Sequence, residues 1–173
     1  VPTTTKRYRG GVPGAFFVVV GRAALGSPPS RTVYLDLEHL ARLQDQRNTP
    51  FTPAVHAYYA LVEALREFED EGGLSARYAR YGALAEQVRA GLDSCGIGSV
   101  LPPKASSVVL RAYRLPEALS YAQLHDGLKA YGFVIYAGQG NLSAELFRIS
   151  TMGDVHAADI ERLLKAFRQS LRP

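Results

Sequence analysis

The longest regular pattern of apolar residues lies in the middle of the chain. Between Asn48 and Gly73 the apolar positions recur every three or four residues, which predicts an amphipathic helix that ends at Gly72 and Gly73. Thr52 is a suitable N-cap, and Pro53 would then occupy the first helical position, where a missing N–H costs nothing. The apolar stripe of this helix consists of Val55, Tyr58, Tyr59, Val62, Leu65 and Phe68.

After this helix, further helices alternate with short extended segments. Three helices are predicted, at residues 75–94, 120–132 and 154–171. Ser120 and Asp154 stand in N-cap position for the second and third of them. The first has an apolar stripe made of Tyr78, Tyr81, Leu84, Val88 and Leu92. Strands are predicted at residues 107–113, 133–138 and 146–152. This order predicts an α+β domain with a short antiparallel sheet and helices on one face.

The first part of the chain reads differently. Residues 15–20, "AFFVVV", follow a glycine-proline turn and predict a strand that is buried on both faces. Such a strand needs neighbouring strands, and the sequence supplies few, since residues 32–46 predict only a short extended piece and a weak helix. We therefore interpret this region as the edge of a larger sheet.

Composition narrows the class of protein. Of the 173 residues, 47% are hydrophobic, yet no apolar run approaches the roughly 20 residues that a membrane helix needs. There is no charged-then-apolar signal segment, which favours the cytoplasm. Cys95 is the single cysteine, so no internal disulfide is expected, and the scattered histidines predict no metal site. The basic run "KRYRG" at residues 6–10 is interpreted as a solvated terminus, and no nucleic-acid partner is expected.

One residue in the predicted strand "LFRIS" needs a separate explanation. Arg148 stands among Leu146, Phe147 and Ile149, all apolar. Side chains alternate between the two faces of a strand, so Arg148 can point away from the core. Either it faces water, as many strand arginines do, or it binds an acidic ligand with the two parallel hydrogen bonds of a guanidinium.

The segments "GVPGAFFVVV", "RNTPFTPAVHAYYALVEALREFEDEGG" and "LFRISTMGDV" together resemble the C-terminal part of a class V aminotransferase of pyridoxal-phosphate fold type I. Within that class the chain is most similar to the 2-aminoethylphosphonate–pyruvate aminotransferases. The resemblance runs from about Gly10 to Phe167, which is around the second half of such an enzyme. It implies an α/β fold of which residues 1–50 are a remnant of the large cofactor-binding domain, 51–73 the interdomain helix and 74–173 the small domain.

The resemblance also implies an activity and the residues that serve it. Family members are homodimers that use pyridoxal phosphate to move the amino group of 2-aminoethylphosphonate to pyruvate, which gives phosphonoacetaldehyde and alanine. Arg148 matches the arginine that binds the acidic group of the substrate. Thr52 matches a threonine that reaches the cofactor phosphate of the other subunit, although capping alone would also explain it. Asp154 is expected to be only a helix cap.

The match departs from the family pattern at the Schiff-base lysine. In the family three residues separate this lysine from the Gly-Val-Pro-Gly turn, which begins here at Gly11, and Arg7 occupies the position of the lysine, with Lys6 one place earlier. A guanidinium stays protonated and cannot form an imine. Lys6 is therefore the candidate catalytic residue, through a one-residue shift, or the chain lacks this lysine.

Three functions stay open on this basis. The chain is the C-terminal part of a phosphonate-handling aminotransferase and inactive alone, or a non-catalytic structural or dimerising module, or an anion-binding domain that has kept Arg148 and lost the chemistry. We expect the valines of residues 15–20 and the stripe of Tyr58, Val62 and Leu65 to be partly exposed in a monomer, which predicts an oligomer.

Overall fold

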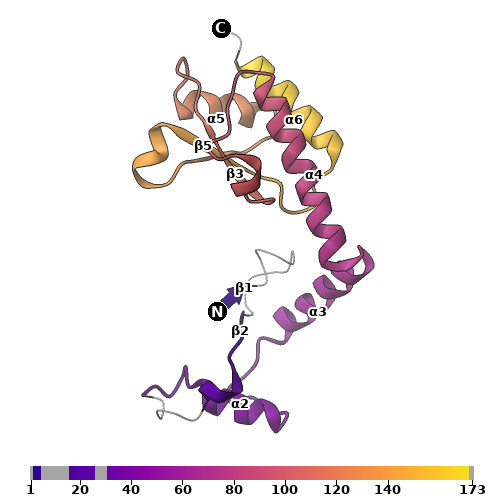
Figure 1. Cartoon of the computed structure of the whole chain (residues 1–173). Coiled ribbons are helices and arrows are strands. Elements are labelled where there is room, and N and C mark those ends of the chain that lie inside the picture. Colours follow the sequence, from indigo (N-terminus) through magenta and orange to yellow (C-terminus); the bar gives the residue numbers. More distant parts are fainter. Residues whose placement is uncertain (1, 5–15, 26–30, 172–173) are drawn as a thin grey trace. The chain divides into compact units, whose positions relative to one another are not determined.

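The structure is a computed structural model that describes residues 2–4, 16–25 and 31–171. The chain divides into two compact units, Val1–Asp70 and Glu71–Pro173. The units are described separately below. The first unit contains two short strands and the helices α2 and α3, and the second contains a three-stranded sheet with the helices α4, α5 and α6 (Figure 1).

In the first unit, β1 (Pro2–Thr4) and β2 (Phe16–Val18) pair as an antiparallel ribbon. The predicted strand within residues 15–20 exists. Its apolar pattern suggested burial on both faces, whereas the expectation that its valines are partly exposed in a monomer is confirmed, because Val18, Val19 and Val20 are 36%, 71% and 39% exposed. Among the described residues β1 is the only strand that pairs with it, and a two-stranded ribbon has too little surface to cover both faces of a strand.

The weak helix expected within residues 32–46 is α2 (Leu37–Asp45), after the short 3-10 helix η1 (Arg22–Ala24). The carboxylate of Asp36 caps α2 by accepting a hydrogen bond of 2.9 Å from the backbone N–H of His39. An aspartate in this position accepts a hydrogen bond from an otherwise unpaired N–H of the first turn, and its negative charge interacts favourably with the positive end of the helix dipole. Local capping thus explains why a weakly predicted helix forms here.

The long central helix is α3 (Val55–Asp70), which confirms the predicted helix but not its cap. The carbonyl of Ala54 accepts the hydrogen bonds of the first turn, from Ala57 and Tyr58 at 2.9 and 3.2 Å. Thr52 therefore lies outside the helix, and the prediction that it caps α3 is wrong. Backbone carbonyls close this turn in place of the threonine hydroxyl.

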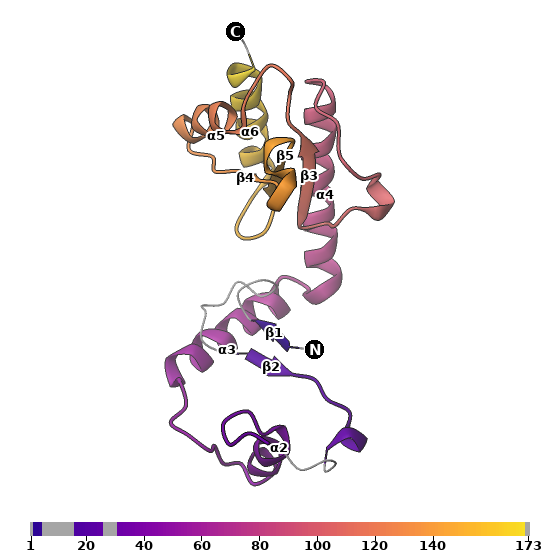
Figure 2. The ribbon, with the colours of Figure 1, turned by 90° about the vertical axis from the view of Figure 1, so that its left-hand side faces the viewer.

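The second unit is built on an antiparallel sheet in the order β3-β5-β4 (Figure 2). Its strands are β3 (Leu110–Arg114), β4 (Tyr136–Ala137) and β5 (Leu146–Ser150). The register pairs Ala112 of β3 and Tyr136 of β4 with Arg148 of the central strand. Two 3-10 helices, η2 (Pro103–Ala105) and η3 (Gly140–Ala144), lie in the connections. The sequence predicted all three strands, although β4 is shorter than expected.

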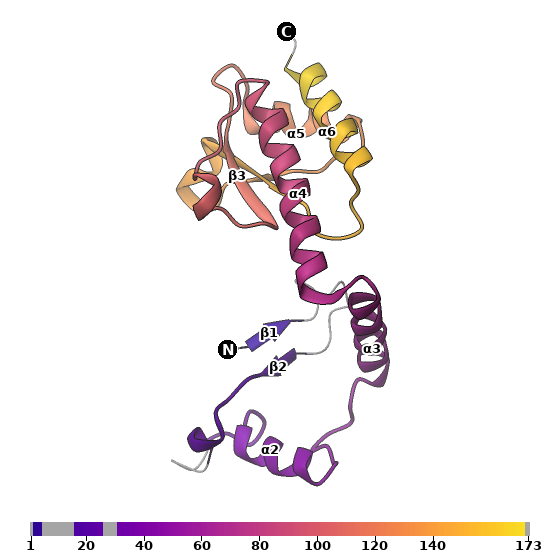
Figure 3. The same cartoon turned by 45° about the vertical axis from the view of Figure 1, so that its right-hand side comes forward.

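Three helices, α4 (Gly73–Asp93), α5 (Tyr121–Ala130) and α6 (Ala157–Ser170), cover one face of this sheet (Figure 3). The core lies between them and the sheet. At its centre the ring of Phe147 packs against Tyr113 and Phe167 with centroid separations of 5.6 and 5.7 Å. Helices α4 and α6 approach closely at Gly91, where an added Cβ would lie 2.2 Å from Cδ1 of Leu164. The predicted α+β architecture is confirmed.

Two details of the predicted helices are corrected. Asp154 does not cap α6, because His156 holds that position and its N–H donates to the carboxylate of Asp159 at 3.0 Å. Asp154 instead contacts Nε2 of His156 at 3.0 Å. In α4 the predicted apolar stripe is buried only in its C-terminal part, since Tyr78 is 60% exposed. Ser120 caps α5 as predicted, by accepting from the N–H of Gln123 at 3.3 Å.

Candidate functional site

Arg148 lies on the face of the sheet that the helices leave uncovered. Its neighbours along β5, Phe147 and Ile149, are buried in the core, so alternation places Arg148 on the opposite face. The residues paired with it are Ala112, which is half-buried, and Tyr136, which is 61% exposed. The side chain of Arg148 therefore points away from the core and is accessible from outside.

The guanidinium of Arg148 is held on one side only. Its Nε donates a hydrogen bond of 2.9 Å to the carbonyl of Ala137 on the neighbouring strand β4. Within the described part of the chain, Nη1 and Nη2 form no hydrogen bond or ion pair. The side chain is thus oriented by the sheet while its terminal N–H groups stay free for an anion, and a planar guanidinium suits two parallel bonds to a carboxylate or phosphonate.

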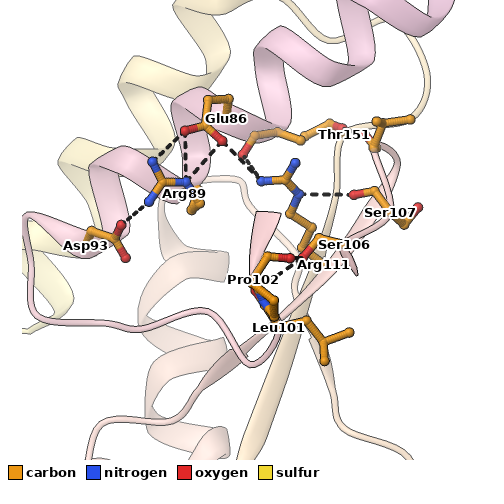
Figure 4. A network of polar contacts seen from close by, with 11 residues as sticks. Glu86, Arg89, Asp93, Leu101, Pro102, Ser106, Ser107, Arg111 and Thr151 are labelled. Atoms are coloured by element: carbon orange, nitrogen blue, oxygen red, sulfur yellow. Dashed lines mark hydrogen bonds and ion pairs between the residues drawn. The ribbon is translucent and has the colours of Figure 1, made fainter. Parts of the chain in front are cut away.

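A second arginine anchors β3 to helix α4 from the other face. Arg111 is 9% exposed, and its Nε donates to the carbonyl of Ser107 at 3.0 Å (Figure 4). Its Nη1 reaches the carbonyl of Ala85 at 3.4 Å and the carboxylate of Glu86 at 3.5 Å. A buried guanidinium needs such partners, and these fix the strand that lies beside Arg148.

The carboxylate of Glu86 joins Arg111 to a network of ion pairs along α4. It accepts from Nε of Arg89 at 2.8 Å, and Arg89 also pairs with Asp93 (Figure 4). The hydrogen bond from Arg89, which is stronger than the opposing effect of burial, holds the pKa of Glu86 below its ordinary value, and Arg111 adds to this. Burial raises the pKa of the neighbouring Tyr113 to about 12, so that phenol stays neutral.

Another arginine pair secures the start of α4. The carboxylate of Glu71 accepts from Nε of Arg77 and from Nε of Arg80, both at 2.5 Å, and Nη1 of Arg80 reaches the carbonyl of Gly153 at 3.3 Å. Burial would raise the pKa of Glu71, but the two arginines outweigh burial and lower the pKa. These contacts join the first turns of α4 to the loop after β5.

Sequence reasoning missed the roles of Arg111 and Arg80. The available signal for Arg111 was its alternation with Tyr113 in "LRAYR", which places a charged residue on the apolar face of a strand. No comparable signal exists for Arg80, because its partners Glu71 and Gly153 are far apart in the sequence. Only the folded chain brings these groups together.

The other predicted site residues are not assembled around Arg148. Thr52 is exposed in the segment before α3 and makes no side-chain hydrogen bond to any residue that the structure describes. Lys6 and Arg7 lie outside the described residues. The described ranges contain no group of three or more His, Cys, Asp or Glu side chains placed to hold a metal ion. They also contain no helix long and apolar enough to span a membrane.

Comparison with known proteins gives a consistent set of relatives. No family model matches the sequence. The 2-aminoethylphosphonate–pyruvate transaminase of Vibrio cholerae is 36% identical over 167 residues, which covers 93% of this chain and 45% of the relative. The transaminase of the same name from Aeromonas hydrophila is 37% identical over 162 residues, covering 90% of this chain and 42% of the relative. The chain thus spans about half the length of the curated relatives that it matches.

Solved structures agree at the level of the fold. An alanine–glyoxylate aminotransferase from Nostoc sp. superposes with a TM-score of 0.87 and 23% identity, over 99% of this chain and 47% of that one. An aspartate aminotransferase from Thermus thermophilus gives a TM-score of 0.72 and 29% identity, over 83% of this chain and 40% of that one. The sequence and fold comparisons together identify the chain as similar to the C-terminal part of class V, fold-type I aminotransferases, and most like the 2-aminoethylphosphonate–pyruvate transaminases.

Proposed function

We propose that this chain provides the substrate-binding part of an aminotransferase that moves the amino group of 2-aminoethylphosphonate to pyruvate. The observation that supports this most is Arg148, whose guanidinium is oriented by Ala137 and keeps its terminal N–H groups free on an open sheet face. The names of the curated relatives supply the reaction.

In this proposal Arg148 binds the acidic group of each substrate in turn. 2-Aminoethylphosphonate and pyruvate both have an amine or carbonyl carbon near an acidic group, so one guanidinium can position either of them. The bond from Nε to the Ala137 carbonyl keeps the side chain from turning away between the two half-reactions. Arg111 on the other face of the sheet holds the neighbouring strand in place.

Pyridoxal phosphate is the cofactor that the fold implies, and it would act as the electron sink for the amino transfer. Of the described residues, we propose Thr52 for contact with its phosphate, because the family resemblance gives it this role and its exposed hydroxyl can donate to a phosphate oxygen. Lys6 is the amine that we propose for covalent attachment and proton transfer, with Arg7 excluded because it stays protonated. The family resemblance implies that Thr52 acts on the cofactor of a partner subunit, so the proposal includes a homodimer.

The test is an alanine-formation assay. The chain is assayed alone and after fusion to the N-terminal part of the Vibrio cholerae transaminase, with pyridoxal phosphate, 2-aminoethylphosphonate and pyruvate. We expect alanine from the fusion, no alanine from the chain alone, and at least a 100-fold loss of kcat/KM in Arg148→Ala, about 3 kcal/mol for a charged hydrogen-bonding group. Arg168→Ala, a change of an exposed arginine on α6, is the matched control.

A fusion that binds the cofactor but forms no alanine would contradict the proposal. The departure at Arg7 supports a second candidate, a domain that binds anions without catalysis. If this second candidate were right, the substrates would bind to the Arg148 face without any amino transfer.

A further inference from the structure

The surroundings of Arg148 are unequal on its two sides. On β4 its pairing partner is Tyr136, whose large side chain stands on the open face. On β3 its partner is Ala112, which offers only a methyl group. A ligand at the terminal N–H groups of Arg148 therefore has more room on the β3 side than on the β4 side.

The next residue of β3 on this same face is Arg114. It pairs with Leu146, two positions from Arg148 along β5, and it is exposed. Such diagonal cross-strand neighbours are about 7–8 Å apart, within reach of two long side chains. No hydrogen bond or ion pair of the Arg114 side chain is formed with the described residues. Arg114 and Arg148 are thus diagonal neighbours on this face, and neither side chain forms an ion pair with the described residues.

The two kinds of acidic group make different demands on such a pair. A carboxylate has two oxygens and one charge, and the terminal N–H groups of Arg148 can satisfy both oxygens. A phosphonate has three oxygens and up to two negative charges, so a single guanidinium leaves one oxygen and one charge without a partner. A second guanidinium on the open side of Arg148 meets that demand.

We propose that Arg114 is a specificity-determining residue that acts with Arg148 to bind a phosphonate dianion in preference to a carboxylate. This inference rests on the proposed function, because it names the substrate group that the Arg148 face selects. Arg148 supplies binding to both classes of acid, and Arg114 supplies the difference between them. Arg148 occupied by a carboxylate such as pyruvate leaves Arg114 solvated.

The test compares methylphosphonate with acetate as probes of the full chain. Binding is followed by NMR through the amide signals of β3, β4 and β5, at a pH where methylphosphonate is a dianion. We expect methylphosphonate to bind about tenfold more tightly than acetate, equivalent to about 1.4 kcal/mol. Arg114→Ala should bring the ratio of the two dissociation constants close to one while changing the acetate constant less than about twofold.

Three further variants separate the possible causes. Arg148→Ala should remove binding of both probes, and Arg168→Ala, which deletes the same charge from α6, should leave the ratio unchanged. Arg114→Lys should keep part of the preference that Arg114→Ala loses, because lysine keeps the positive charge but lacks the planar arrangement of guanidinium donors. A circular dichroism spectrum like that of the unchanged chain shows that each variant is folded.

Several results would overturn the inference. These are equal affinity of the unchanged chain for both probes, absence of methylphosphonate binding to the β-sheet, an equal loss of both affinities in Arg114→Ala, and an unchanged ratio in that variant. These results can be distinguished from a failure of the proposed aminotransferase function. A fusion that forms no alanine while the chain keeps its Arg114-dependent preference would contradict the aminotransferase proposal alone.

Discussion

The two units of the chain differ in how much of their apolar surface they bury. In Glu71–Pro173 the sheet and three helices enclose a continuous core around Tyr113, Phe147 and Phe167. In Val1–Asp70, Ala64 is the only buried residue among residues 17–25 and 31–70. Large apolar side chains such as Val33 and Tyr59 are there 89% and 74% exposed. The second unit is built as a domain, whereas the first presents surface that other protein should cover.

This difference also separates the two kinds of functional group. Arg148 and its supports lie on strands that pack against the core of the second unit, and the hydrogen bond that orients Arg148 is formed within this unit. Thr52 lies in an exposed segment and has no partner in the described chain. The arginine that we propose for substrate binding is therefore oriented within this unit, while we propose that the cofactor site needs a further domain or subunit.

The largest effect that we expect comes from the core of the second unit. Phe147→Ala removes a fully buried ring between Tyr113 and Phe167 and should lower the free energy of unfolding by about 3–5 kcal/mol. Tyr59→Ala, an exposed aromatic of the first unit, should change it by less than about 0.5 kcal/mol. Urea unfolding measures both, and similar losses in the two variants would contradict the contrast between the units.

The next effect concerns Arg111. Arg111→Ala removes the donors to the carbonyls of Ser107 and Ala85 from a site with little access to water, which should cost about 1–3 kcal/mol. Arg111→Met should cost less, because an apolar side chain of similar length refills the space. If neither variant differed in stability from Arg168→Ala, Arg111 would not anchor β3.

A smaller effect is expected from pH. The pKa of Glu71 is lowered in the folded chain from about 4.5, so the contribution of this carboxylate is fully present above that pH and is lost as the pH falls through the folded-state pKa. Glu71→Gln should therefore lower stability at neutral pH and flatten its decline in acid. Unfolding followed from neutral pH to pH 3 in both proteins checks this, and equal slopes would contradict it.

The smallest effect is expected at Thr52. The residue is exposed and lies outside α3, so Thr52→Val should leave the free energy of unfolding within about 0.5 kcal/mol. The same change should weaken pyridoxal-phosphate binding in the fused enzyme, measured by cofactor absorbance in a titration. A loss of stability near 1 kcal/mol would instead indicate a capping role.

Most of the fold of the second unit was predictable, because its helices and strands have clear periodicity and local caps such as Ser120. The errors occurred where tertiary structure or backbone geometry decided the outcome. Ala54 closes the first turn of α3 in place of Thr52, and the strand at residues 15–20 lacks the neighbours that would bury it. Arg148 was singled out through alternation and the family resemblance, and Arg111 could have been noticed from its alternation with Tyr113, whereas Arg114 gains meaning only from the sheet register.

The most direct test of the account is to locate the cofactor. The chain fused to the N-terminal part of the Vibrio cholerae transaminase is mixed with pyridoxal phosphate and reduced with borohydride, and the labelled peptide is identified by mass. The part of the fusion that comes from this sequence has four lysines, Lys6, Lys104, Lys129 and Lys165, so an adduct within that part can be assigned to one of them. We predict one adduct per chain at Lys6. Absence of an adduct, or labelling spread over the other three lysines, would contradict an aminotransferase built on this chain.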